Sequence, residues 1–177
     1  MSVLHFHMGK HRIEILTDRR YSSNHMWCRP VKGNAVGAVG QEQSGMVQEG
    51  ETEWSGAAEC LWRVGFSPFA ERLIRDVFFI DWTVSEGAVV ERGREVGTVE
   101  SAKAVSGFAA PMHGTIVRFN QALLDDPSLI NVDPYGLGWL YEMVGSGEGL
   151  MSAAEYVDYL SRAWLDAQRR LKGQVDS

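Results

Sequence analysis

One lysine at the tip of a short β-hairpin has the clearest chemical potential in this chain. Lys103 lies in the stretch 96–105, in which two short β-forming runs meet at a tip of small residues. Most lysines are solvated surface charges, and a protonated amine does little chemistry by itself. An amide bond to a carboxylic acid removes that charge and adds a new group. We therefore interpret Lys103 as a site of covalent modification.

Two similar strand-turn-strand segments flank this lysine. Gly87 lies within the apolar run 84–90 and Gly114 within the apolar run 110–117, and we expect both to be turn glycines. The pattern predicts a small barrel or sandwich with the lysine at one hairpin tip, an arrangement that resembles the biotinyl/lipoyl-carrier fold.

The residues next to Lys103 distinguish the two carrier types. Biotinyl carriers have methionines beside the lysine, whereas this chain has Ala102 and Ala104 there, with Ser101 and Glu100 before them. This tip resembles a lipoyl site. The motif is followed by a second one, 131–140, with the sequence NVDPYGLGWL.

Together the two motifs resemble those of the H protein of the glycine cleavage system. The resemblance implies a mainly β fold, a biotinyl/lipoyl-carrier barrel-sandwich hybrid with short helices and a C-terminal amphipathic helix. It also implies lipoate as the cofactor, in amide linkage to Lys103, with Glu100, Ser101, Ala102 and Ala104 forming the attachment site. Within the second motif, we expect Asp133–Gly136 to form a β-turn and Trp139 to fill core beside it.

The resemblance implies a carrier that serves partner enzymes. A lipoyl lysine is a long flexible arm that takes its cargo from one enzyme to the next, and the tether raises the local concentration. Expected partners are a lipoate ligase or lipoyl transferase, dihydrolipoamide dehydrogenase, and either glycine cleavage enzymes or a heterodisulfide-reductase-like complex. Independent catalysis is not expected, because His25 and His113 accompany no nucleophile motif. A purely structural protein with Lys103 unmodified is a further alternative.

Two departures from the family pattern bear on the cargo. The family's His-Glu-Trp triplet is His25-Met26-Trp27 in this chain, and Gly107 stands where the family has an aspartate. A cargo cleft lined by Asn24, His25, Met26 and Gly107 would offer an ammonium group no ion pair. We therefore expect a sulfur-based cargo, as in H-like lipoate-binding proteins of bacterial sulfur oxidation. The alternative is the aminomethyl cargo of glycine cleavage.

Composition narrows the possible partners. The net charge of −6 and a pI near 5.4 argue against a nucleic-acid or anionic-membrane partner. We find no pattern of a secretory signal or a membrane span and expect a cytoplasmic protein. Cys28 and Cys60 form no C-x-x-C pair, so we expect two reduced thiols, with exchange against a dithiolane as the alternative. His5, His7 and His11 lack a completing ligand, and no metal site is expected.

The chain divides into three predicted parts. Residues 1–20 form an N-terminal extension, of which 1–12 are expected to be solvated or weakly ordered. Residues 21–150 form the carrier domain, with an insertion at 41–62. Residues 151–172 form a C-terminal helix docked on that domain, because apolar residues recur there at helical spacing.

Local signals within the carrier domain predict several short elements. Gly33-Asn34 favours a hairpin turn before a strand at 35–39, and the end of the insertion, 54–64, is apolar enough to form a strand. Ser67-Pro68 predicts a helix start, with Phe69, Leu73 and Ile74 turned inward. One helical turn is expected at 121–124. Ser152 and Glu155 form a capping-box pattern at the start of the last helix.

Overall fold

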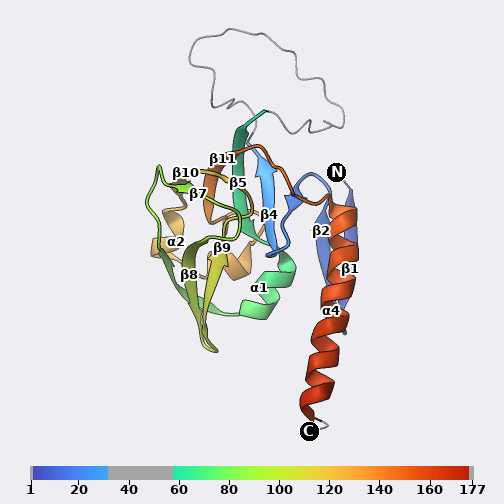
Figure 1. Cartoon of the computed structure of the whole chain (residues 1–177). Coiled ribbons are helices and arrows are strands. Elements are labelled where there is room, and N and C mark those ends of the chain that lie inside the picture. The colour runs from blue at the N-terminus through green and yellow to red at the C-terminus, as the bar shows by residue number, and fades with distance from the viewer. Residues whose placement is uncertain (1, 32–57, 176–177) are drawn as a thin grey trace.

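A computed structural model describes residues 2–31 and 58–175 (Figure 1). The fold is mainly β, with short helices and one long C-terminal helix, as predicted. The strands are β1 (Val3–Met8), β2 (His11–Leu16), β3 (Arg20–Tyr21), β4 (Met26–Pro30), β5 (Cys60–Phe66), β6 (Val77–Trp82), β7 (Val89–Val90), β8 (Glu95–Ser101), β9 (Val105–Ala109), β10 (Gly114–Phe119) and β11 (Tyr141–Gly145). The helices are α1 (Pro68–Ile74), α2 (Ala122–Asp125), α3 (Leu129–Val132) and α4 (Ala153–Val175).

Two sheets enclose the main core. One has six strands in the order β3-β4-β5-β11-β10-β7, and the other has three in the order β6-β8-β9. Alternate residues of each strand face inward, as the two-residue period of a strand requires. The buried side chains include Met26, Val64, Val99, Phe108 and Met143. Both sheets contribute side chains to this core, so it forms between two sheets and does not require a closed barrel.

The strand predicted at 54–64 is present in part as β5, which begins at Cys60 and continues to Phe66. It pairs antiparallel with β4, from Met26 opposite Phe66 to Pro30 opposite Trp62. The predicted turn at 33–34, the strand at 35–39 and most of the 41–62 insertion lie outside the described residues.

The N-terminal segment is ordered, so the expectation of a solvated end was wrong. Strands β1 and β2 form an antiparallel hairpin with Met8 opposite His11. Its buried residues, Phe6 and Ile15 among them, belong to a second core cluster that also contains residues of α4. The hairpin acquires its hydrophobic partners from segments outside it, Phe69 of α1 and residues of α4 among them, which explains why local sequence did not reveal it. The residues from 2 to 31 and 58 to 175 contain no metal-binding group of histidines, cysteines and acids.

Helix α4 begins with the predicted capping box. The Glu155 amide donates to the Ser152 hydroxyl (3.2 Å), and the Ser152 amide donates to the Glu155 carboxylate (3.0 Å). Tyr156 and Leu160 are fully buried. The helix packs chiefly on the β1–β2 hairpin, beside the carrier sheets (Figure 1). No helix in the described part of the chain is long and apolar enough to cross a membrane.

Other local predictions hold in part. Ser67 caps α1, with Pro68 in its first turn and Phe69 buried, but Leu73 is 55% exposed and does not face inward. The α2 turn ends at Asp126, next to the proline that stops it. Gly87 is a turn glycine with φ 86°. Gly114 is not, because it lies in β10, where a Cβ would overlap the Val144 carbonyl oxygen.

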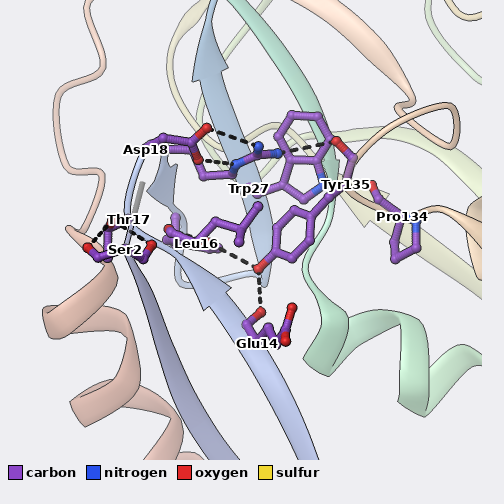
Figure 2. Close-up of polar contacts among 10 residues, drawn as sticks. Ser2, Glu14, Leu16, Thr17, Asp18, Trp27, Pro134 and Tyr135 are labelled. Carbon is purple, nitrogen blue, oxygen red and sulfur yellow. Dashed lines mark hydrogen bonds and ion pairs between the residues drawn. The ribbon is translucent and has the colours of Figure 1, made fainter.

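An arginine joins the N-terminal region to the second motif. The Arg19 guanidinium packs against the rings of both Trp27 (4.8 Å) and Tyr135 (4.7 Å), which also contact each other, and it pairs with Asp18. Trp27 donates to the Pro134 carbonyl (2.9 Å), and the Tyr135 hydroxyl donates to the Glu14 carbonyl (2.7 Å), as Figure 2 shows.

The second motif is a turn tied down by its own side chains. The Gly136 amide donates to the Asp133 carbonyl (3.1 Å), which forms the predicted β-turn, and the Leu137 amide donates to the Asp133 carboxylate (2.9 Å). Trp139 packs against the second core cluster and also lies 4.5 Å from the Arg63 guanidinium. It is therefore only partly a core residue.

Candidate lipoyl-attachment site

Lys103 lies at the exposed tip of the β8–β9 hairpin, which projects from the body of the molecule (Figure 1). The tip is closed by the Ser101 amide, which donates to the Ala104 carbonyl (3.0 Å). Ser101 itself is buried, whereas Ala102, Lys103 and Ala104 are exposed. Among the described residues, Lys103 has no ion pair or hydrogen-bond partner, so its amine is open to an enzyme that acts on it.

A row of three side chains crosses the sheet next to the tip. Glu100 on β8 lies opposite Phe79 on β6 and opposite Val105 on β9. Residues directly opposite in antiparallel strands share a face, so all three are on the same side of the sheet. Phe79 is 50% exposed and Val105 is 63% exposed. Glu100 therefore stands between two exposed apolar side chains, close to the lysine.

Gly107 is on the same face of β9, and a carboxylate covers it. A Cβ placed on Gly107 would overlap Oε1 of Glu95. Glu95 begins β8 and is exposed. The expectation of no carboxylate at this position was therefore wrong, because β8 supplies one where β9 has none. A glycine inside a strand signals close approach of another group, and this was the available sequence signal.

The proposed cleft residues are only partly brought together. Asn24 lies near the end of β9, because its amide donates to the carbonyls of Ala109 (3.3 Å) and Ala110 (3.2 Å). Met26 has no exposed surface and belongs to the main core. It lines no open cleft, contrary to expectation, because the two-residue period of β4 points it inward with Cys28.

His25 faces α4 and α1. Its Nδ1 lies 2.8 Å from the Tyr156 hydroxyl, which is also 2.8 Å from the Ser67 hydroxyl. The His25 ring packs on Phe69, with the centroids 4.6 Å apart. Burial lowers the pKa of His25 from 6.5 to about 4, so the ring is neutral at physiological pH. Its φ of 66° is in the left-handed region. These contacts fix the start of β4, a structural role that sequence reasoning missed.

The cysteines are poorly suited to thiol exchange. Cys28 is fully buried, and burial raises the pKa of its thiol well above the usual range. Burial also raises the pKa of Cys60 to about 11. Both thiols stay protonated at neutral pH, whereas exchange requires the thiolate. His113 pairs with Glu91 (3.0 Å) on the surface and has no nucleophile partner among the described residues.

Comparison with known proteins decides the family. A family model described as "Glycine cleavage H-protein" matches residues 46–163. The chain belongs to this family.

Individual H proteins give the same result. The glycine cleavage system H protein of Corynebacterium jeikeium is 37% identical over 139 residues, which cover 78% of this chain and 91% of that protein. That of Myxococcus xanthus is 36% identical over 117 residues, or 64% of this chain and 90% of that protein. The crystal structure of an H protein from Mycobacterium marinum matches with a TM-score of 0.60 and 33% identity, covering 83% of this chain and 99% of that one.

H proteins are carriers that bear lipoate covalently on a lysine, and lipoate is the cofactor of this family. The tip of the β8–β9 hairpin fits such a group, because its lysine is exposed and has no partner among the described residues. When bound, lipoate supplies a dithiolane whose sulfurs accept electrons and cargo. The protein supplies the anchor and the surface around it.

Proposed function

We propose that this chain is a lipoyl carrier with lipoate in amide linkage to Lys103, and that its cargo is the aminomethyl group of glycine cleavage. The observation that carries the proposal is the exposed amine of Lys103 at the tip of the β8–β9 hairpin, which has no partner among the described residues. Glu100 lies next to this tip, opposite Val105. The remaining lysines of the chain, at 10, 32 and 172, lie outside this motif. Catalysis belongs to the partner enzymes.

Two findings support the aminomethyl cargo over a sulfur-based one. The relatives named above are all glycine cleavage system H proteins. In addition, the physical reason to expect a sulfur cargo is weaker than the sequence indicates, because Met26 is buried and Glu95 places a carboxylate over Gly107. A cationic cargo would therefore have a negatively charged group, the Glu95 carboxylate, within reach of the arm.

A sulfur-based cargo remains the second candidate. One observation favours it: Met26 replaces the glutamate of the family triplet, so this chain has one carboxylate fewer near Asn24. In that case a heterodisulfide-reductase-like complex would take the place of the glycine cleavage enzymes. Lipoate ligase and dihydrolipoamide dehydrogenase would serve the carrier in either case.

Attachment is tested by intact mass after incubation with a lipoate ligase, ATP and lipoate. We expect one lipoyl amide on the wild-type chain, located to Lys103 by peptide mapping, and none on Lys103→Arg. Lys10→Arg is the matched control and should be modified like the wild type. Modification at another lysine, or none with an active ligase, would refute the proposal.

The cargo is tested on the lipoylated protein. With glycine decarboxylase and labelled glycine, an aminomethyl carrier accepts label at the rate of an ordinary H protein. A carrier of sulfur-based cargo does not accept label under these conditions. Lipoylated Lys103→Arg protein cannot form, so that variant gives the background of the assay.

A further inference from the structure

Four charged residues form a row across the outer face of the six-stranded sheet. Arg29 on β4 lies opposite Arg63 on β5. Arg63 and Arg118 on β10 both lie opposite Glu142 on β11, one from each side. Trp62, the neighbour of Arg63, points into the main core, so the row faces away from that core. Three arginines thus meet one glutamate on the surface of a chain whose net charge is −6.

The glutamate balances the charge at one end of the row only. Glu142 is almost fully buried, and its Oε1 accepts hydrogen bonds from Arg63 (3.0 Å) and Arg118 (2.6 Å). The side chain of Arg29 has no ion pair and no hydrogen bond among the residues that the structure describes. Like charges directly opposite each other in antiparallel strands are destabilising. The excess positive charge is therefore concentrated at Arg29 and Arg63.

Both of these arginines are half-buried, which makes the excess charge more costly. Arg29 and Arg63 each have a buried Nε with no hydrogen-bond acceptor in the described part of the chain. Burial, together with the positive charges of Arg19 and Arg63, lowers the pKa of Arg29. A charge that is removed from water without a partner raises the free energy of the folded state. A bound anion would lower that free energy.

We propose that this row is a docking site for an acidic peptide segment of a partner protein, held by Arg29 and Arg63 at one end and by Arg118 at the other. The row spans three strand spacings, which is roughly 14 Å at about 4.8 Å each. Residues i and i+4 of an extended peptide lie on one face, roughly 13 Å apart. Guanidinium groups bind carboxylates through two parallel hydrogen bonds. Acidic residues at i and i+4 therefore match the two ends of the row, whereas a single small anion matches only one end.

The site is partly preorganised and separate from the lipoyl hairpin. The Trp139 ring lies 4.5 Å from the Arg63 guanidinium and 5.7 Å from that of Arg118, so it supports both side chains. Lys103 is carried by the other sheet, β6-β8-β9. A partner held at the row would leave the hairpin tip free, and the contact would raise the local concentration of one protein near the other. The proposal does not depend on the cargo or on attachment of lipoate.

The test uses a defined acidic probe and the full chain labelled with nitrogen-15. The probe is a five-residue peptide of alternating glutamate and glycine, blocked at both ends. The readout is the set of arginine Nε–Hε NMR resonances. We expect saturable shifts at Arg29, Arg63 and Arg118 and none at the exposed Arg12. The same peptide with glutamine in place of glutamate should cause no shift, and high salt should weaken the binding of the acidic peptide.

Substitution of Arg29 separates a docking role from a structural one. Arg29→Gln should weaken binding of the acidic peptide about fivefold or more, because it removes one end of the row. The same variant should unfold at an equal or higher urea concentration than the wild type, because it loses no partner in the chain and no longer repels Arg63. Arg12→Gln is the matched control, since it removes the same charge from the exposed face of the β1–β2 hairpin, and it should bind the peptide like the wild type.

Small anions provide the comparison that decides the kind of ligand. Acetate and inorganic phosphate should bind at least about fivefold more weakly than the peptide, because neither reaches both ends of the row. Equally tight binding of either one would show a site for a single small anion and overturn the proposal. Equal binding of the peptide by the wild type and Arg29→Gln would also overturn it, whether or not the variant is less stable in urea.

Discussion

Replacing His25 by asparagine should remove a specific pH dependence of stability. In the folded chain His25 packs on Phe69 and contacts Tyr156, and burial lowers its pKa from 6.5 to about 4. Between these values the unfolded chain binds a proton at this residue and the folded chain does not. The stability is therefore fully present above pH 6.5 and is lost as the pH falls toward 4.

The magnitude follows from the two pKa values. At about 1.4 kcal/mol for each pH unit, the interval from 6.5 to about 4 corresponds to a loss of about 3 kcal/mol. Asparagine is the appropriate replacement because it tolerates the left-handed φ of 66° at this position and does not titrate. The loss of the contact with Tyr156 lowers the free energy of unfolding by the same amount at every pH. The pH dependence can therefore still be measured.

Urea unfolding, followed by circular dichroism between about pH 7.5 and about pH 4.5, measures this effect. The stability difference between the wild type and His25→Asn should shrink or reverse by about 2.5 kcal/mol over this range, which ends just above the folded-state pKa. His5→Asn is the control, because His5 is an exposed residue of β1, and its curve should run parallel to the wild type. A difference between wild type and His25→Asn that stays constant with pH would refute the reasoning.

Three further predictions concern the tip, the arginine contact and the terminal helix. Glu100→Ala should slow lipoylation of Lys103 while the melting temperature stays the same; an unchanged initial rate in a ligase assay would count against a recognition role. Arg19→Ala should cost about 2 kcal/mol in urea unfolding, because it removes a buried cation that packs against two aromatic rings and leaves Asp18 unpaired; the exposed Arg12→Ala should cost less than about 0.5 kcal/mol, and an equal loss in both would contradict the assignment. Leu160→Ala should cost about 2–5 kcal/mol, whereas Leu165→Ala, at a 52% exposed position, should cost less than about 0.5 kcal/mol, again by urea unfolding. Similar losses for the two leucines would show that α4 does not pack as described.

Sequence was sufficient where neighbouring residues determine the structure. The capping box of Ser152 and Glu155, the cap at Ser67 and the small-residue tip at Lys103 depend on residues a few positions apart. The family resemblance rested on two such local motifs, and the comparisons confirm it. Local patterns therefore located the hairpin tip and the start of the last helix.

Sequence was insufficient where the outcome depends on contacts between distant segments. The β1–β2 hairpin is stabilised by α4, about 150 residues later, so its histidine-rich strands looked like a solvated end. Met26 could not be assigned to the core without the pairing of β4 and β5. The carboxylate over Gly107 comes from a neighbouring strand, so a residue-by-residue comparison with the family pattern recorded it as missing.

The division of the apolar side chains into two clusters has a practical consequence. Leu160, Phe6 and Ile15 belong to the cluster under α4, whereas Val99 and Phe108, which support the hairpin of Lys103, belong to the other. Substitutions in the cluster of the β1–β2 hairpin and α4 should therefore leave recognition of the Lys103 hairpin by a ligase largely intact. Fluorophores or affinity tags attached to exposed residues of α4 can then be used to measure binding of partner proteins without altering the surface around Lys103.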